Sequence, residues 1–178
     1  MKKVLLSFAV LGTLALASCD KIKDAIFPSF ETTIGEVTVV VPIITNTASE
    51  TEMGRISVNF NIDSVIKKYT ANQFSISNAT SIKVQNTTVH LVNGDAINNL
   101  SSFETIKLSV ASDAVPTPAV IAQEAITSDA NPIVINGNDT NLKEYLKGGR
   151  VTYTLSGKAK RPTTKPLQLS VTVALKVN

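Results

Sequence analysis

Few residues in this chain have the chemistry for catalysis. The 178 residues include one cysteine, Cys19, one histidine, His90, and 14 aspartates and glutamates. A serine triad would have to use His90, and the chain contains neither a G-x-S-x-G nor an H-E-x-x-H motif. One histidine and one cysteine do not complete a metal-ligand set. Two carboxylates are enough for glycan hydrolysis, so a carboxylate-dependent hydrolase stays open.

One loop is rich in oxygen-bearing side chains of the kind that bind calcium. Residues 136–141 read Asn-Gly-Asn-Asp-Thr-Asn, and Ca²⁺ takes carboxylate and amide oxygens. The loop lacks EF-hand spacing, however. Asn141 and Glu144 have the spacing of a capping box, and Gly148 would end a helix at residues 142–147. We therefore expect no metal and no cofactor.

Four basic residues lie close together near the C-terminus. Lys158, Lys160, Arg161 and Lys165 all fall within residues 157–166. They are suited to contact anionic lipid headgroups or an acidic polysaccharide, because each basic residue near an anionic surface contributes about 1 kcal/mol. Alternatively, lysines protect a long hairpin from edge-to-edge pairing. We favour this second explanation and keep the first as the candidate anion-contact site.

The elements that would position these residues are predicted to be strands. Apolar residues alternate with polar ones, or form β-branched runs, near residues 34–41, 56–62, 74–92 (one or two strands), 106–110, 119–126, 133–135, 151–156 and 167–177. The apolar phase changes between Val84 and Val89, which predicts a bulge or a turn near Asn86. His90 lies in the polar phase and is expected at the surface. Asp63 is expected to cap a short helix at residues 64–69.

These patterns predict an all-β protein. We expect an antiparallel β-sandwich, immunoglobulin-like or Greek-key, with about seven to nine strands and two or three short helices. A closed barrel is the alternative. The C-terminal pair of strands is predicted to form a hairpin in which Val171 and Val173 point inward, while Ser170 and Thr172 face water.

The N-terminus has the pattern of a secretion signal. Lys2 and Lys3 precede an apolar run at residues 4–17, which is shorter than the ~20 residues that a membrane-spanning helix needs. The run ends in Leu16-Ala17-Ser18-Cys19. This sequence resembles the lipobox of bacterial lipoprotein precursors, in which the cysteine receives a diacylglyceryl group and becomes the mature N-terminus.

The resemblance covers residues 1–19 and implies both a location and an anchor. Acyl chains on Cys19, palmitate among them, would hold the protein at the cell envelope, with the outer membrane as our expectation. Asp20, Lys21 and Asp24 follow the cysteine, as sorting signals do in such lipoproteins, but they match no one rule. We expect a signal peptide at residues 1–18, a lipidated tether at 19–30 and one β-sandwich domain at 31–178.

The charge of the mature chain is close to neutral. Removing residues 1–18 removes two lysines from the 17 basic residues and none of the 14 acids, which leaves +1. This argues against nucleic acid as a partner, because phosphate binding needs a clustered basic surface. Once Cys19 is acylated, no thiol is left for a disulfide. We expect a monomer whose stability comes from packing.

These observations favour a binding or structural module of the envelope, without catalytic activity. Its expected partners are the membrane, through the anchor, and an envelope protein or polysaccharide. Two other functions stay open. A lipid carrier would need an apolar cavity inside the sandwich, and a glycan hydrolase would need two carboxylates in one cleft.

Overall fold

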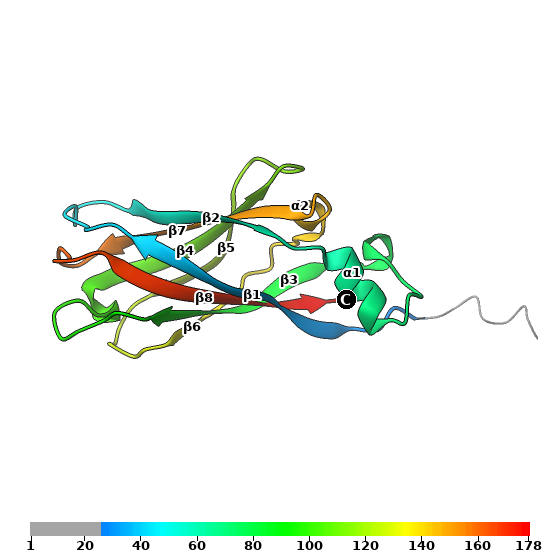
Figure 1. The fold of residues 1–178 in the computed structure, drawn as a ribbon, viewed down its shortest axis with the longest axis horizontal. Coiled ribbons are helices and arrows are strands. Elements are labelled where there is room, and N and C mark those ends of the chain that lie inside the picture. The colour runs from blue at the N-terminus through cyan, green and yellow to red at the C-terminus, as the bar shows by residue number, and fades with distance from the viewer. Residues whose placement is uncertain (1–25) are drawn as a thin grey trace, which may run out of the picture.

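The computed structural model describes residues 26–178, which form two stacked sheets of four strands each (Figure 1). The strands are β1 (Phe30–Val41), β2 (Thr51–Asn59), β3 (Ile82–Leu91), β4 (Phe103–Ser112), β5 (Ala119–Ala125), β6 (Ile133–Asn136), β7 (Arg150–Ala159) and β8 (Leu167–Val177). Short helices α1 (Ile62–Tyr69) and α2 (Lys143–Leu146) and the 3-10 turns η1 (Ile76–Asn78) and η2 (Leu100–Ser102) lie between them. The predicted all-β antiparallel sandwich is confirmed.

The strand order defines the fold more closely. One sheet has the order β1-β8-β3-β6 and the other β2-β7-β4-β5, and every pair is antiparallel. The pairs β1/β8, β2/β7, β3/β6 and β4/β5 are those of one long antiparallel ribbon, and the pairs β3/β8 and β4/β7 join successive turns when the ribbon is rolled up. This is a jelly roll, which contains two Greek keys. The immunoglobulin order and the closed barrel do not fit.

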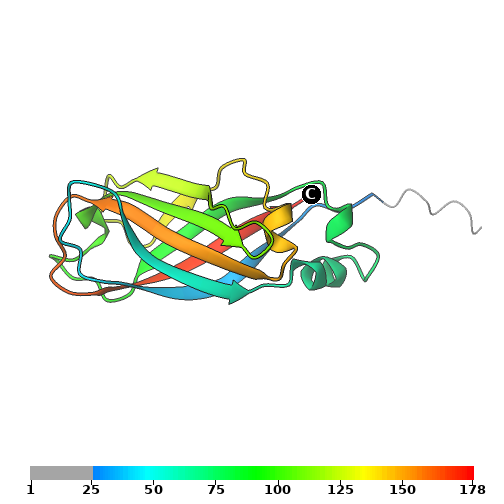
Figure 2. The same ribbon diagram turned by 90° about the horizontal axis from the view of Figure 1, so that it is seen from above.

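The predicted C-terminal hairpin is wrong. β7 and β8 belong to different sheets, and residues 160–166 cross between the sheets at one end of the sandwich (Figure 2). The phase of both strands is nevertheless right, because Tyr153 and Leu155 on β7 are buried, as are Val171 and Val173 on β8. An alternating pattern indicates which face of a strand is buried, but it does not indicate the partner strand.

The outer face of β8 is less exposed to solvent than predicted. Ser170 was expected in water, but it is only 6% exposed. Its hydroxyl donates a hydrogen bond to the Glu36 carboxylate of the neighbouring strand β1, and that side chain covers it. Thr172 is half-buried on the same face.

Two local predictions on β3 are confirmed. The pairing register with β8 shifts between Val84 and Asn86, where the apolar phase of the sequence changes. His90 is exposed, whereas Val89 and Leu91 on either side of it are buried.

The predicted cap of α1 is wrong. The N-cap is Asn61, whose side-chain oxygen accepts the Ser64 N–H at 3.0 Å. Asp63 lies in the first turn instead, where its carboxylate accepts the Ile76 N–H at 2.9 Å and pairs with Lys67. It therefore ties α1 to the 3-10 turn that follows.

The predicted capping box at α2 is also absent. The Asn141 side-chain oxygen accepts N–H groups from Ile82 on β3 and from Lys143, while Glu144 forms an ion pair with Lys147. The connection to β7 turns at Gly149, whose φ of +71° favours glycine.

The two ends of the sandwich differ in what they carry. β1 begins and β8 ends beside α1 and α2, and we call this the helix end (Figure 1). Strands alternate in direction, so the loops at residues 42–50, 92–102, 126–132 and 160–166 gather at the opposite end, which we call the loop end.

Glycine permits close backbone contact on both open sides of the sandwich. A Cβ on Gly54 of β2 would lie 2.4 Å from Val39 Cγ1 of β1. A Cβ on Gly137, just after β6, would lie 2.0 Å from the backbone oxygen of Val84. The Gly137 N–H donates to the Gln85 carbonyl at 3.0 Å, so the loop lies directly on β3.

The contact at Gly137 gives a prediction about stability. Gly137→Ala should destabilise the domain by about 2–3 kcal/mol, because the added methyl group collides with backbone that cannot move aside. Gly35→Ala is the matched control, since a Cβ there meets no atom within 4 Å, and it should change stability by less than about 0.5 kcal/mol. Chemical denaturation measures both variants. Equal midpoints would contradict the close approach of the 137–142 loop to β3.

Candidate functional site

The four basic residues of the predicted anion-contact site lie at the loop end, or next to it on β7. Two of them are paired with acids from distant parts of the chain. Lys158 contacts Glu104 at 2.7 Å, and Lys165 contacts Asp95 at 2.7 Å. These two lysines bring little net positive charge to the surface.

Lys160 and Arg161 instead contact neutral groups. The Lys160 ammonium donates to the Ile126 carbonyl at 2.7 Å. The Arg161 guanidinium donates from Nε to Ser102 Oγ and from Nη2 to Asn99 Oδ1, both at 3.1 Å. Neither forms an ion pair with a carboxylate in the part of the chain that the structure describes. The two neighbours therefore form a positive spot without an internal counter-charge.

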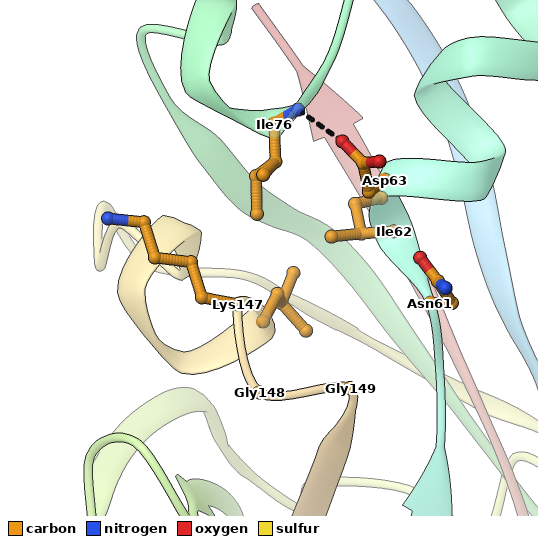
Figure 3. A pocket seen from close by; sticks show the side chains of 8 residues that line it. Asn61, Ile62, Asp63, Ile76, Lys147, Gly148 and Gly149 are labelled. Carbon is orange, nitrogen blue, oxygen red and sulfur yellow. Dashed lines mark hydrogen bonds between the residues drawn. The ribbon is translucent and has the colours of Figure 1, made fainter.

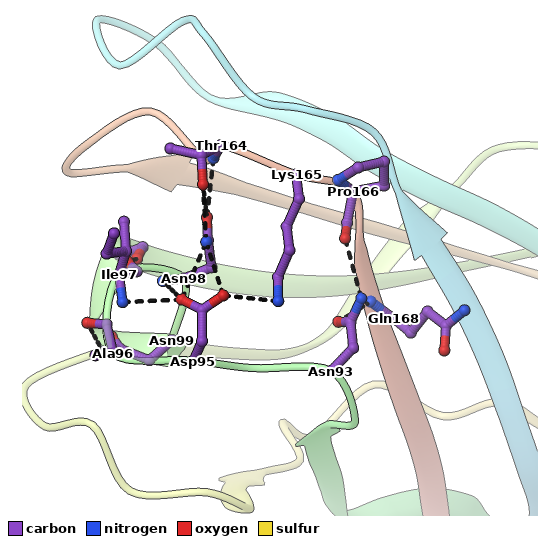
Figure 4. A network of polar contacts seen from close by, with 11 residues as sticks. Asn93, Asp95, Ala96, Ile97, Asn98, Asn99, Thr164, Lys165, Pro166 and Gln168 are labelled. Atoms are coloured by element: carbon purple, nitrogen blue, oxygen red, sulfur yellow. Dashed lines mark hydrogen bonds and ion pairs between the residues drawn. The ribbon is translucent and has the colours of Figure 1, made fainter.

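A polar network holds the loop beside this spot in one conformation (Figure 4). The Asp95 carboxylate accepts the Ile97 and Asn98 backbone N–H groups at 2.9 and 2.7 Å. The Lys165 ammonium and the Asn98 donors hold the pKa of the Asp95 carboxyl far below its usual range. The Asn98 side chain in turn donates to Thr164 Oγ1 at 2.9 Å. Residues 93–99 are thus tied to residues 163–166.

Sequence reasoning missed an aliphatic rim around these loops. Val40, Ile43, Val92 and Ile97 are 59, 50, 54 and 60% exposed. Val40 lies opposite Gln168 in the β1/β8 ladder, and the Val92 N–H donates to the Gln168 carbonyl, so the two valines flank β8 on the outer face of the sheet. An outward-pointing valine next to a strand end was the signal available in the sequence.

Three shallow hollows lie on the surface, and one of them is lined in part by the 126–132 loop of the loop end. The first, of about 220 Å³, lies between α1 and α2 and contains Asp63 and Lys147 (Figure 3). The second, of about 260 Å³, contains Glu31, and the third, of about 300 Å³ between β5 and β6, contains Glu124. Each of these hollows offers one carboxyl group, whereas carboxylate-dependent hydrolysis uses two.

The side chains of the oxygen-rich loop at residues 136–141 are used in hydrogen bonds between the two sheets. The Asn138 amide and the Thr140 hydroxyl donate to the Val120 carbonyl on β5 at 2.7 and 3.2 Å. Asp139 contacts Lys83 on β3 at 2.8 Å, and this ammonium lowers the pKa of its carboxyl. The loop therefore closes the β5/β6 side. Residues 26–178 contain no group of three or more ionisable metal ligands.

The predicted lipidation site, Cys19, and the signal at residues 1–18 lie outside the described residues. Within residues 26–178, no helix has the length and apolar character needed to cross a bilayer. β1 begins at Phe30, close to the predicted start of the domain.

Comparison with known proteins identifies no family for this chain. No family model matches the chain, and no curated protein matches it. Among solved structures, a chain of desmodium yellow mottle tymovirus is 15% identical, with a TM-score of 0.28, and the match covers 99% of this chain and 94% of that one. A chain of the extra small virus of the prawn Macrobrachium rosenbergii is 11% identical, with a TM-score of 0.17 over 97% and 95%. TM-scores this low give no information about the function of this chain.

The Asp95 network predicts a pH-dependent stability. An unfolded aspartate titrates near pH ~3.9, so a lower pKa in the folded state stabilises the domain above that pH, and the effect is lost as the pH falls towards the folded pKa. Asp95→Asn should lower the melting temperature at pH 7 by a few degrees, and the deficit should shrink below pH ~4. Asp129→Asn, in an exposed loop, is the control and should match the parent throughout. A pH-independent deficit for Asp95→Asn would contradict the ionic role.

Proposed function

We propose that this protein is a lipid-anchored module of the bacterial cell envelope, held at the outer membrane through Cys19. The module binds a partner at its loop end and catalyses no reaction. The lipobox at residues 16–19 supports the anchor. The observation that carries the proposal is that β1 starts at the helix end. The chain therefore enters the domain from the side opposite to the loop end.

The dimensions support a partner other than the anchoring membrane. β8 has 11 residues, so it spans ~35 Å at ~3.3 Å per residue. Lys160 and Arg161 lie at the far end of this length from the tether. They are therefore better placed to bind a partner on the side away from the membrane than to contact the lipid headgroups next to the anchor. Of the anionic surfaces considered above, this favours one other than the anchoring membrane.

The chemistry of the loop end favours an acidic protein over a polysaccharide. The exposed apolar side chains there are branched aliphatic residues, and the whole chain contains no tryptophan. Sugar rings are bound on flat aromatic faces, which aliphatic side chains do not offer. Aliphatic contacts around a positive spot suit a protein surface that carries carboxylates.

The two alternative functions receive less support. The inward side chains of both sheets form one buried core with members such as Phe103, Ile106 and Leu169, and the three hollows described above are shallow and at the surface. A lipid carrier needs an apolar cavity, and a hydrolase needs a second carboxylate beside Asp63, Glu31 or Glu124.

The anchor is tested by removing the acylated residue. Cys19→Ala should release the protein from the outer-membrane fraction, because the acyl chains are its membrane anchor. Fractionation of cells that express the full chain, followed by blotting, measures the release. A Cys19→Ala protein that still requires detergent for extraction would contradict the proposal.

Reversing two charges at the loop end tests whether the partner binds there. Lys160→Glu combined with Arg161→Glu should remove a crosslink between the full chain and a partner in intact cells, because an acidic partner is then repelled. Arg150→Glu combined with Lys176→Glu makes the same charge change at exposed positions of the helix end and should leave the crosslink intact. Loss of the crosslink in both double variants, or in neither, would argue against binding at the loop end. Retention on immobilised dextran sulfate, lost only in the first variant, would point to a polysaccharide instead.

A further inference from the structure

The start of the described chain is held by an aromatic cluster at the helix end. Phe27 packs edge-on against Phe74, with ring centroids 5.4 Å apart, and lies 6.4 Å from Phe30. Phe30 stacks on Tyr69 of α1 at 4.4 Å, with the ring planes 11° apart. The four rings connect the residues before β1 with α1 and with the segment that follows it. We call them the aromatic clamp.

Local backbone structure brings Phe74 into the clamp. α1 ends at Tyr69, and the next residues turn sharply, with Ala71 and Asn72 in the left-handed region at φ 49° and 64°. The Thr70 hydroxyl donates to the Ile66 carbonyl and accepts the Phe74 N–H at 3.3 Å. The turn reverses the chain, so that Phe74 meets Phe27. Because of the clamp, the chain emerges from the domain in a fixed place.

The clamp lies close to the proposed anchor. Residues 20–25 separate Cys19 from Ile26, and an extended chain covers at most ~3.5 Å per residue, so Ile26 lies within ~25 Å of Cys19. This reach is shorter than the ~35 Å length of the sandwich. With the chain fixed at the clamp, the helix end is the part of the domain nearest to the bilayer that holds the acyl chains.

The surface beside the clamp suits a bilayer interface. Ile26 is 89% exposed, and Tyr69 is 55% exposed although its ring stacks on Phe30. Lys68 is exposed and forms no ion pair within residues 26–178. An aliphatic side chain, a tyrosine with an apolar body and a polar tip, and a free ammonium are the groups that lie well at the level of lipid headgroups.

From these observations we propose that the helix end docks on the anchoring membrane through Ile26, Lys68 and Tyr69. The aromatic clamp keeps the long axis of the domain pointing away from the membrane, so that the loop end faces away from the bilayer. The occupant of this surface is the lipid bilayer itself. The inference rests on the proposed acylation of Cys19, and it adds an orientation that the anchor alone does not impose.

The orientation can be measured with single thiol labels. Cys19 is the only cysteine, and acylation blocks its thiol, so Gln73→Cys at the helix end and Asp129→Cys at the loop end, both exposed positions, each introduce one reactive thiol. The acylated full chain, labelled with a fluorophore, is placed in phosphatidylethanolamine–phosphatidylglycerol vesicles that contain headgroup spin-labelled lipid. We expect strong quenching of the label at position 73 and no quenching at position 129.

Two charge insertions test the contact itself. Ile26→Glu places a carboxylate at the proposed interface without removing a ring of the clamp and should reduce the quenching at position 73. Val134→Glu is the matched control, because Val134 on β6 is 59% exposed, and it should leave the quenching unchanged. Phe27→Ala opens the clamp and should make the quenching at positions 73 and 129 more alike.

The outcomes separate the two proposals. Equal quenching at both positions, in a chain that still sediments with the vesicles, would overturn the docking while the lipid anchor stands. Quenching at position 129 alone would overturn it in the same way. A chain that carries no acyl group and does not sediment would overturn the anchor and, with it, the docking.

Discussion

The ladder between β1 and β8 is the constraint on which the rest of the molecule depends. It pairs the first strand with the last, from Phe30 opposite Val177 to Val41 opposite Leu167. A ribbon whose ends are paired in this way has its remaining strands nested inside, β2 with β7, β3 with β6 and β4 with β5. Rolling that ribbon brings β3 against the other side of β8, so the last strand lies inside its sheet. The C-terminal strand is therefore essential to the core, although it forms last during synthesis.

The same ladder sets the polarity of the molecule. Since β1 and β8 are antiparallel, the chain enters and leaves at one end, and the Ser29 hydroxyl donates to the Asn178 side chain at 2.9 Å. Connections between successive strands then fall alternately at the two ends. The connections at the helix end contain α1 and α2, whereas those at the loop end are held by side-chain networks such as that of Asp95. A single pairing thus separates the helix end, where both chain termini of the domain lie, from the loop end.

The sequence predicts which strand residues are buried better than it predicts helix caps or strand partners. The alternation of Val151, Tyr153 and Leu155 predicts their burial, and the phase change at Asn86 predicts the bulge, because both depend on neighbours a few residues away. The partner of β7 does not follow from its own pattern. Connections of a few residues usually join paired strands, yet residues 160–166 join strands of different sheets. Only the pairing of distant segments decides between these arrangements.

The candidate anion-contact site shows the same difference between what the sequence predicts and what depends on contacts between distant residues. The four basic residues are visible in the sequence, but the net charge that they bring to the surface depends on Glu104 and Asp95, which lie more than fifty residues earlier and reach Lys158 and Lys165 only because the chain is rolled up. Pairing cancels Lys158 and Lys165 and leaves Lys160 and Arg161. Similarly, the loop at residues 136–141 has the composition of a calcium-binding loop, but its side chains contact β3 and β5, two strands that its own sequence does not identify.

The hydrogen bonds at the loop end also bear on the binding of a partner that we propose for it. Asp95, Asn98 and Thr164 join residues 93–99 to residues 163–166, so contacts within the domain position this part of the proposed binding surface. A preorganised surface loses less conformational entropy on binding than flexible loops do, which favours affinity from a small contact area. In the proposed orientation, the aromatic clamp would hold the helix end at the bilayer, and the Asp95 network would hold the loops of the opposite end in place. The loop end would then face away from the bilayer without any further structural element.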